Sequence, residues 1–323
     1  EKLIDSLKDK GKVSELIDFC SKDPSKIQSL FIILDYLGLD EFQRKNLEPF
    51  SKVFPNVPLD QIPKTIKQLD VSNLNVGKVD FSKFEHLESI DLSGSKALTA
   101  KQFNSIPNKA SILSLNLEGV NVRGFDFSEF TGIKNLDLSD VQDLTARQFN
   151  SISNKSSLEN LKLNNIDIKN FDFLDFKELK GLDLRDVQEL TAVQFNAISQ
   201  EAKDSIEHLD LSSSSGSDKL SITGFDLSSF RKLKSLNLSG TEGLTARLFN
   251  AISKKARDSI EDLDLSRSNV SGFNFSGFTK LKSLTLRPVY KLTAMQLSTI
   301  PLEAKASIKD LDLGFTRFKD FDF

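Results

Sequence analysis

The chain has 323 residues, and its 43 Lys and Arg nearly balance its 46 Asp and Glu, which gives a formal net charge of −3. This balance argues against a nucleic acid or a membrane surface as the partner, since a marked excess of positive charge would be expected for either. The single cysteine, Cys20, excludes an internal disulfide, and no run of 18 or more apolar residues is present to span a membrane.

Residues 1–61 contain no internal repeat, but their apolar residues recur at helical spacing. Asp23 and Pro24 mark the start of a helix, and Gly38 marks its end. We therefore expect a helical N-terminal cap, or a small helical domain, which shields the first repeat from water. A second binding or effector role for these helices is the alternative. Cys20 falls on the apolar face of a predicted helix, where an inert buried thiol is expected.

From residue 62 to residue 323, short Leu-x-Leu segments recur, and each predicts a strand. Their first apolar residues are 21 to 27 positions apart, and the gaps mostly alternate in length. The first apolar residues are Leu69, Ile90, Leu115, Leu136, Leu161, Leu182, Leu209, Leu236, Leu263, Leu284 and Leu311. One gap, between Leu209 and Leu236, is lengthened by a polar insertion at residues 212–219. The segment thus predicts about eleven short strands in a repeating array.

Every second gap contains the phrase Leu-Thr-Ala, which begins at Leu98 and predicts a short helix. The phrase returns at Leu144, Leu190, Leu244 and Leu292. In four of the five copies a Gln follows the Thr by three residues, as Gln102 follows Thr99, and this is the spacing of a capping box. Ala100, Phe103 and Ile106 then lie three residues apart on one face of the helix, which we expect to pack inward.

The other gaps contain a phrase built on Phe-Asp-Phe, in which the alternation of apolar residues indicates extended chain. It occurs at Phe125–Phe127, Phe171–Phe173, Phe225–Leu227, Phe273–Phe275 and Phe321–Phe323, with a forerunner at Val79–Phe81. A further Phe follows three residues after the phrase, as Phe130 follows Phe127. Each ring would bury roughly 150–250 Å² if the copies stack on one another. We therefore expect these rings to form an aromatic core rather than a ligand site.

The strand phrase, as in Leu136-Asp137-Leu138, resembles that of leucine-rich repeat proteins. The resemblance implies an α/β fold, a leucine-rich repeat solenoid over residues 62–323 that follows the helical N-terminal cap of residues 1–61. Its parallel strands would form a curved, concave sheet, with short helices and extended segments on the convex side. The chain departs from the family where that pattern has an Asn. The residues there are Ser95, Val120, Val141, Ile166, Val187, Ser214, Thr241, Ser268 and Val289, so the family's Asn ladder is expected to be missing.

In such a fold, alternate strand residues face solvent on the concave side. The residue inside each Leu-x-Leu then forms a mainly acidic stripe, which is interrupted near the centre by larger and chemically varied residues. Such varied positions are where a repeat protein usually holds its specificity. The predicted partner-binding residues are Asn160, Lys162, Asn164, Asp183, Arg185, His208, Asp210, Asp262, Asp264, Asp310 and Asp312. The other interpretation of the stripe is that duplication copied an Asp that has no role in binding.

The sequence offers little for an enzyme. His86 and His208 are the only histidines, the Asp residues do not have metal-ligand spacing, and Gly11-Lys12 lacks the rest of a phosphate-binding loop. We expect no catalytic residue, no cofactor and no metal site.

The function that we predict is a protein-protein interaction module, which binds a protein partner with a basic surface on the concave face. The alternative is a secreted or injected effector, or a surface recognition protein, of an intracellular pathogen or symbiont. We expect a cytoplasmic location, or secretion into a host cell under the alternative. We further expect the C-terminal edge of the array to be covered by further residues or by another protomer.

Overall fold

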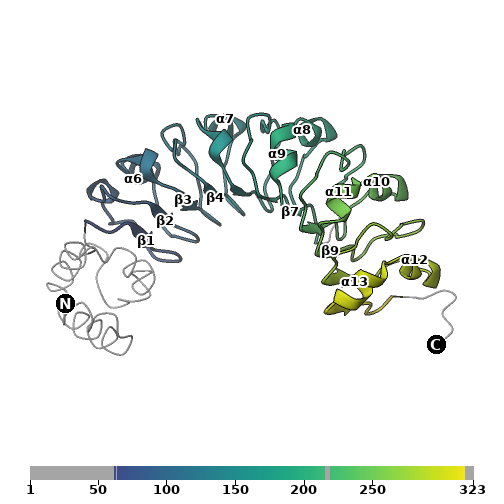
Figure 1. The fold of residues 1–323 in the computed structure, drawn as a ribbon. Coiled ribbons are helices and arrows are strands. Elements are labelled where there is room, and N and C mark those ends of the chain that lie inside the picture. Colours follow the sequence, from purple (N-terminus) through teal and green to yellow (C-terminus); the bar gives the residue numbers. More distant parts are fainter. Residues whose placement is uncertain (1–61, 63, 215–218, 317–323) are drawn as a thin grey trace, which may run out of the picture. The chain divides into compact units, whose positions relative to one another are not determined.

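The computed structural model describes residues 62, 64–214 and 219–316, which form two compact units. The first unit comprises residues up to 137 together with 141–154, and the second comprises 138–140 and residues from 155 onward. The predicted helices of residues 1–61, Cys20 and the last Phe-Asp-Phe phrase lie outside the described residues. In each unit the strands lie on one side and the short helices on the other (Figure 1). We call the solvent side of the strands the strand face and the opposite side the helix side.

The described residues of the first unit form four strands and four short helical segments. Its elements are β1 (Gln68–Asp70), η2 (Phe81–Lys83), β2 (Ser89–Asp91), α6 (Ala100–Asn104), η3 (Lys109–Ser111), β3 (Ser114–Asn116), β4 (Asn135–Asp137) and α7 (Ala146–Asn150). The strands pair in parallel and in the order of the chain. The central Leu or Ile of each strand is aligned with that of the next, for example Leu115 with Leu136.

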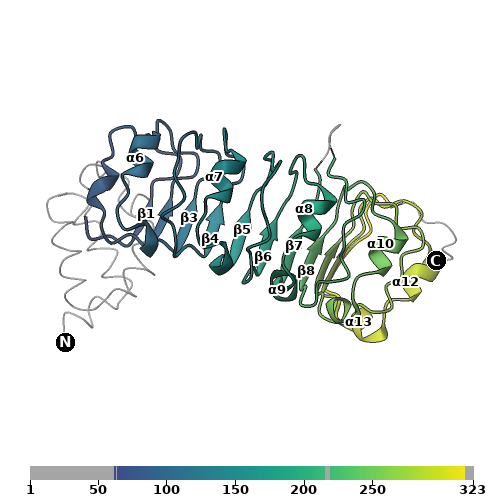
Figure 2. The same ribbon diagram turned by 90° about the horizontal axis from the view of Figure 1, so that it is seen from above.

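The second unit repeats this plan with seven strands. Its elements are η4 (Lys155–Ser157), β5 (Asn160–Lys162), β6 (Gly181–Asp183), α8 (Ala192–Asn196), α9 (Gln200–Ser205), β7 (His208–Asp210), β8 (Ser235–Asn237), α10 (Ala246–Asn250), α11 (Lys254–Arg257), β9 (Asp262–Asp264), β10 (Ser283–Thr285), α12 (Ala294–Ser298), α13 (Leu302–Ser307) and β11 (Asp310–Asp312). Strands β5 to β8 run side by side in chain order (Figure 2). The prediction of about eleven short parallel strands is confirmed, since the two units together have eleven.

The Phe rings form the core between strands and helices, as predicted. Phe103 of α6 stacks on Phe125 at 4.1 Å between ring centroids and lies 5.7 Å from Phe127. The same arrangement returns in the second unit, where Phe249 stacks on Phe273 at 4.3 Å. These rings are almost fully buried. The aromatic phrase is therefore a packing element that occupies the space beneath each helix.

The capping boxes are also present. Thr99, Thr145, Thr191 and Thr293 each accept a hydrogen bond from the backbone N–H of the Gln three residues later, and that Gln bonds back to the Thr N–H. In α10 the residue three after Thr245 is Leu248, so only the Thr half of the box exists. Each box satisfies two backbone donors that a helix start would otherwise leave without partners.

We expect Thr145→Ala to lower the free energy of unfolding by about 1 kcal/mol, because the change leaves the Gln148 backbone N–H at the start of α7 without its acceptor. Urea unfolding of the purified variant measures the loss. Thr145→Ser is the matched control, since it keeps the hydroxyl oxygen and should recover most of the stability. An Ala variant as stable as the parent would contradict the assigned cap.

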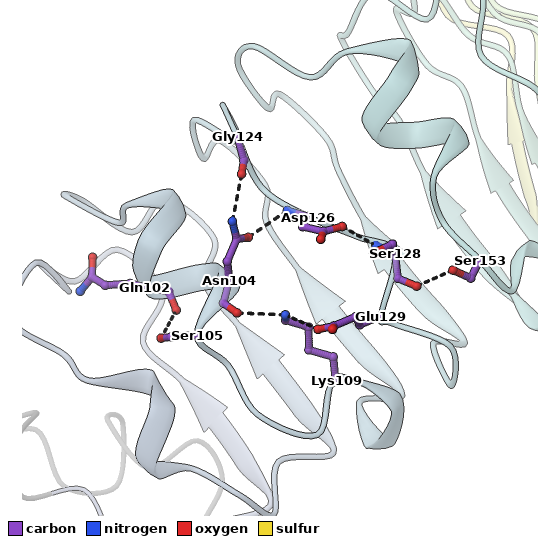
Figure 3. A network of polar contacts seen from close by, with 9 residues as sticks. All are labelled: Gln102, Asn104, Ser105, Lys109, Gly124, Asp126, Ser128, Glu129 and Ser153. Atoms are coloured by element: carbon purple, nitrogen blue, oxygen red, sulfur yellow. Dashed lines mark hydrogen bonds and ion pairs between the residues drawn. The ribbon is translucent and has the colours of Figure 1, made fainter.

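The Gln and Asn of the helix phrase also form hydrogen bonds to the backbone of neighbouring turns, which the sequence did not reveal. The Gln102 side-chain amide donates to the carbonyls of Val76 and Val79, both at 2.9 Å, so it reaches back to the preceding extended phrase. Asn104 reaches forward, since its Nδ2 donates to the Gly124 carbonyl at 3.1 Å and its Oδ1 accepts the Asp126 N–H at 2.9 Å (Figure 3). This polar ladder on the helix side links successive turns, whereas the family's Asn position is here mostly apolar and buried.

A buried cation completes the same network. Lys109 is 6% exposed, and its Nζ donates to the Asn104 carbonyl at 3.0 Å and to the Glu129 carboxylate at 2.6 Å (Figure 3). Lys203 repeats the contact in the second unit with the Asn196 carbonyl at 2.7 Å. A positive charge at these carbonyls satisfies the end of each short helix and favours its dipole. Burial lowers the pKa of Lys203, while Asp226 raises it.

Candidate protein-binding face

The strand register of the second unit brings the predicted central residues together in two rows. Lys162, Asp183 and Asp210 are aligned on β5, β6 and β7, and Asn160, Gly181 and His208 form the neighbouring row. Parallel strands are about 4.8 Å apart, so each row spans roughly 10 Å. Asn160, Lys162, Asp183, His208 and Asp210 thus lie on three successive strands, and Arg185 follows β6 by two residues. Their role in binding remains a prediction.

The Asp inside the Leu-x-Leu of these strands is only partly exposed, which corrects the expectation that it faces solvent freely. Asp183 and Asp210 are half-buried, and the Oδ1 of each accepts the backbone N–H two residues later, at 3.1 Å from Arg185 and 2.8 Å from Ser212. Asp264 makes the same contact with the N–H of Ser266. The Asp therefore closes the turn that follows the strand, a local bond that Asp and Asn side chains commonly make.

Two natural Asn residues show that this turn needs the side-chain oxygen and not the charge. Asn116 and Asn237 occupy the same strand position, and their Oδ1 atoms accept the N–H groups of Glu118 and Ser239, each at 3.0 Å. Their Nδ2 groups donate across the sheet to the Asp of the preceding strand, at 3.2 Å for Asp91 and 3.1 Å for Asp210. Asp→Asn is consequently the substitution that removes charge and retains the turn.

Much of the charge at the centre of the strand face is paired locally. We call Asn160, Lys162, Asn164, Asp183, Arg185, His208 and Asp210 the central patch. The Arg185 guanidinium lies 3.0 Å from Asp183 Oδ2, and its positive charge also faces Asp210 and Asp186. Burial, together with the charge of Asp210, raises the pKa of Asp183, while hydrogen bonds from Arg185 lower it. Lys162 is aligned with Asp183 on the other side. Lys162 and Arg185 equal Asp183 and Asp210 in number, while Asp186 adds a third carboxylate beside them, so this patch offers mixed hydrogen-bonding groups with little net charge.

The acidic character is concentrated instead on β9 to β11. Asp262 and Asp264 are aligned through Ser283 and Thr285 with Asp310 and Asp312. Asp262 and Asp310 are exposed, and among the described residues no Lys or Arg forms an ion pair with Asp262, Asp264 or Asp310. Arg287, which sequence analysis missed, lies 3.6 Å from Asp312. Arg287 follows Leu284 by three residues, as Arg185 follows Leu182. Aligning the repeats could therefore have identified Arg287 as a residue of this face. We call these four aspartates the β9–β11 acidic patch.

Asn164 and His208 take different places in the central patch. His208 is exposed at the start of β7, whereas Asn164 is half-buried just after β5. The Asn164 Oδ1 is buried and has no hydrogen-bond partner among the described residues. Its side-chain oxygen and nitrogen are assigned by their surroundings, as for any amide. Asn164 is therefore a packing position as much as a surface one.

Alternating charges line the edge where the strands begin. Glu159 pairs with Lys180 at 2.6 Å, Glu207 with Lys234 at 2.7 Å, and Glu261 with Lys282 at 2.7 Å. The hydrogen bond from Lys234 lowers the pKa of Glu207. Because the opposite charges alternate from strand to strand, this edge carries no net charge that would attract a charged partner. The β9–β11 acidic patch is thus the main charged feature of the strand face in the second unit.

Metal ligands and membrane-spanning helices were two further features to look for in the described part of the chain. No group of three or more His, Cys, Asp or Glu residues there has an arrangement that could hold a metal ion. None of the described helices has both the length and the apolar composition required to cross a lipid bilayer.

The predicted C-terminal edge includes Leu311 of β11, which is 50% exposed, whereas Leu284 of β10 is fully buried. What covers that edge stays a prediction.

Neither a protein-family model nor a curated protein sequence matches the chain. Solved structures do match. A complex of TLR13 with ssRNA13 has a TM-score of 0.50 and 20% identity over 82% of this chain and 38% of that chain. A leucine-rich repeat protein of Leptospira interrogans has a TM-score of 0.41 and 15% identity over 79% of this chain and 71% of that one.

A third match is the plant peptide hormone receptor RGFR1 in complex with RGF2, with a TM-score of 0.46 and 15% identity over 78% of this chain and 43% of that chain. The chain therefore spans less than half the length of the TLR13 and RGFR1 chains. At these identities the likeness concerns the fold. The parallel strands in chain order, the alternating short and long repeats and the likeness to the TLR13 chain agree that this chain has the leucine-rich repeat fold.

Proposed function

We propose that the chain is a non-enzymatic interaction module, which binds a protein partner through the strand face of the second unit. The observation that supports this proposal is the β9–β11 acidic patch, where four aspartates lie on β9 and β11 on either side of β10, and only Asp312 has a cationic partner, Arg287, among the described residues. Because β9 and β11 are roughly 10 Å apart, each pair of like charges across β10 repels by less than about 0.5 kcal/mol in water. A partner with a basic surface would relieve that repulsion and add charge complementarity.

The central patch would then supply selectivity. Its Lys162, Arg185 and His208 alternate with carboxylates and the amide of Asn160, so it presents donors and acceptors in a fixed order. Mixed charges that are already balanced add little to long-range attraction, but they penalise a partner that leaves them unpaired after desolvation. The two patches therefore have different expected roles, attraction for the acidic patch and discrimination for the central one.

The effector or surface recognition alternative would use the same face, so the same variants test both. Affinity capture followed by mass spectrometry identifies a partner, and titration calorimetry then measures its affinity for purified variants. Neutralising the acidic patch with Asp262→Asn, Asp264→Asn, Asp310→Asn and Asp312→Asn should weaken binding at least about 10-fold and flatten its salt dependence. The fold should persist, since Asn116 and Asn237 already close this turn.

The matched control lies on the helix side of the first unit. Lys101→Glu with Arg147→Glu alters two exposed cations on α6 and α7. This double variant should bind as the parent does. If it abolishes binding while the four Asp→Asn changes have no effect, the partner uses the helix side, and the aspartates serve only to close turns.

A further inference from the structure

Residues 220–230 form the extended phrase between β7 and β8, and they depart from the equivalent phrases of the chain in three respects. The equivalent phrases are residues 120–130, 166–176 and 268–278. From these departures we infer that residues 220–230 are the part of the second unit that opens first, a local unfolding step built into the repeat array. The inference concerns the fold and does not depend on the proposed function.

The first departure is a missing pair of hydrogen bonds. In the second unit, the Gln194 side-chain amide donates to the carbonyls of Ile168 and Phe171, at 2.9 and 3.3 Å. Gln296 likewise donates to the carbonyls of Val270 and Phe273. Leu248 stands where a Gln would donate hydrogen bonds to the carbonyls of Ile222 and Phe225, and the Leu side chain has no donor. The phrase at residues 220–230 is thus attached to the following helix by fewer polar contacts.

The second departure is a smaller core residue. In the phrase at residues 268–278, Phe249 contacts three rings, those of Phe273, Phe275 and Phe278, at 4.3, 5.6 and 5.5 Å. Leu227 takes the place of the middle ring in residues 220–230. Phe195 therefore meets only Phe225 and Phe230 there, at 4.3 and 5.8 Å. An aromatic pair contributes about 0.5–1.5 kcal/mol beyond the area that it buries, and this phrase lacks that contribution.

The third departure is the polar insertion that precedes the phrase. In most repeats the residue four after the first apolar strand position has a left-handed backbone, as Asp186 does with φ 54°. Ser213 stands at that place after β7 and does not have a positive φ. The turn is held instead by side-chain contacts, including Leu220 N–H to Ser213 Oγ at 3.4 Å. The entry into the phrase thus lacks the left-handed residue found in most repeats and is longer in sequence.

Opening at residues 220–230 would also loosen the contacts between neighbouring strands on the strand face. The phrase connects β7 to β8, and the bond from Asn237 Nδ2 to Asp210 Oδ2 joins those two strands at 3.1 Å. Local opening exposes only the contacts of one segment and has a smaller free energy than global unfolding. The array would therefore be most adaptable beside the central patch.

Hydrogen exchange of the whole chain, followed by mass spectrometry under native conditions, tests the inference. Peptides covering residues 220–230 should exchange roughly five- to tenfold faster than those covering 166–176 and 268–278. Leu248→Gln should slow exchange in 220–230 by a similar factor and leave 268–278 unchanged. The matched reverse variant, Gln194→Leu, should speed exchange in 166–176. Equal protection of the three phrases in the parent protein would overturn the inference, and an unchanged rate in Leu248→Gln would overturn Leu248 as its cause.

Discussion

Phe127→Ala should lower the free energy of unfolding by about 3–5 kcal/mol, because it removes a buried ring and leaves a cavity that the repeat cannot close. Phe127 is 1% exposed and contacts Phe103 at 5.7 Å and Phe130 at 6.4 Å between ring centroids. Phe173 in the second unit is equally buried and lies 6.0 Å from Phe176 between ring centroids, so Phe173→Ala should cost a similar amount. Denaturant unfolding, followed by circular dichroism, gives the free energy of each variant.

The comparison that decides this prediction is with the cap variant Thr145→Ala, which should cost only about 1 kcal/mol. Leu174→Ala is a further control, because Leu174 adjoins Phe173 in the chain but is 59% exposed. That change should leave stability within about 0.5 kcal/mol. If the Phe variants were no less stable than the Thr variant, the rings would not be the core of the array.

Gly240→Ala is expected to cost about 3 kcal/mol or more, since backbone strain and a backbone clash act together there. Gly240 has φ +69°, and an added Cβ would lie 2.0 Å from the Ser213 carbonyl oxygen. That oxygen is main chain, so a side-chain rotation cannot relieve the contact. The clash arises where the polar insertion begins, because Ser213 lacks the left-handed backbone found at most equivalent positions. Thermal unfolding should show a large loss for this single methyl group.

Gly119→Ala separates the two causes. Gly119 has a similar φ of +70°, but no atom lies within 4 Å of an added Cβ. Only the backbone strain remains, so the cost should be about 1–2 kcal/mol. If Gly240→Ala were no more harmful than Gly119→Ala, the Ser213 backbone would have shifted to accept the methyl group, and the contact would be softer than its distance suggests.

The fold was accessible from the sequence because its signals are repeated. Leu115 and Leu136, for example, are aligned as the repeat predicts, and Thr99 with Gln102 forms the expected box. A weak local preference gains force when it recurs five times at a nearly constant spacing. The burial of Phe125 and Phe127 followed from the same regularity.

The contacts between turns were not accessible in this way. The Gln102 amide bonds to Val76, which is 26 residues earlier in the chain, and Asn104 bonds to Gly124, which is 20 residues later. Spacing alone does not reveal which backbone groups meet when one turn stacks on the next. The local pairing of charge in the central patch was missed for a related reason. Arg185 is two residues from Asp183, and only the direction of its side chain decides whether it pairs with that carboxylate or faces a partner.

The Gln and Asn of the helix phrase form hydrogen bonds with the turns before and after it. These bonds determine how many residues can be added to or removed from such a chain. Gln148 needs the carbonyls of Val122 and Phe125 behind it, while Asn104 needs Gly124 and Asp126 ahead of it. Deleting one half-repeat would leave an amide facing another amide-bearing helix, with its donors and acceptors unmatched. Deleting or copying the full pair of 46 residues would restore every one of these bonds at the new junction. Recombination within such a gene should therefore yield viable proteins only in whole pairs, so that paralogues differ by even numbers of strands.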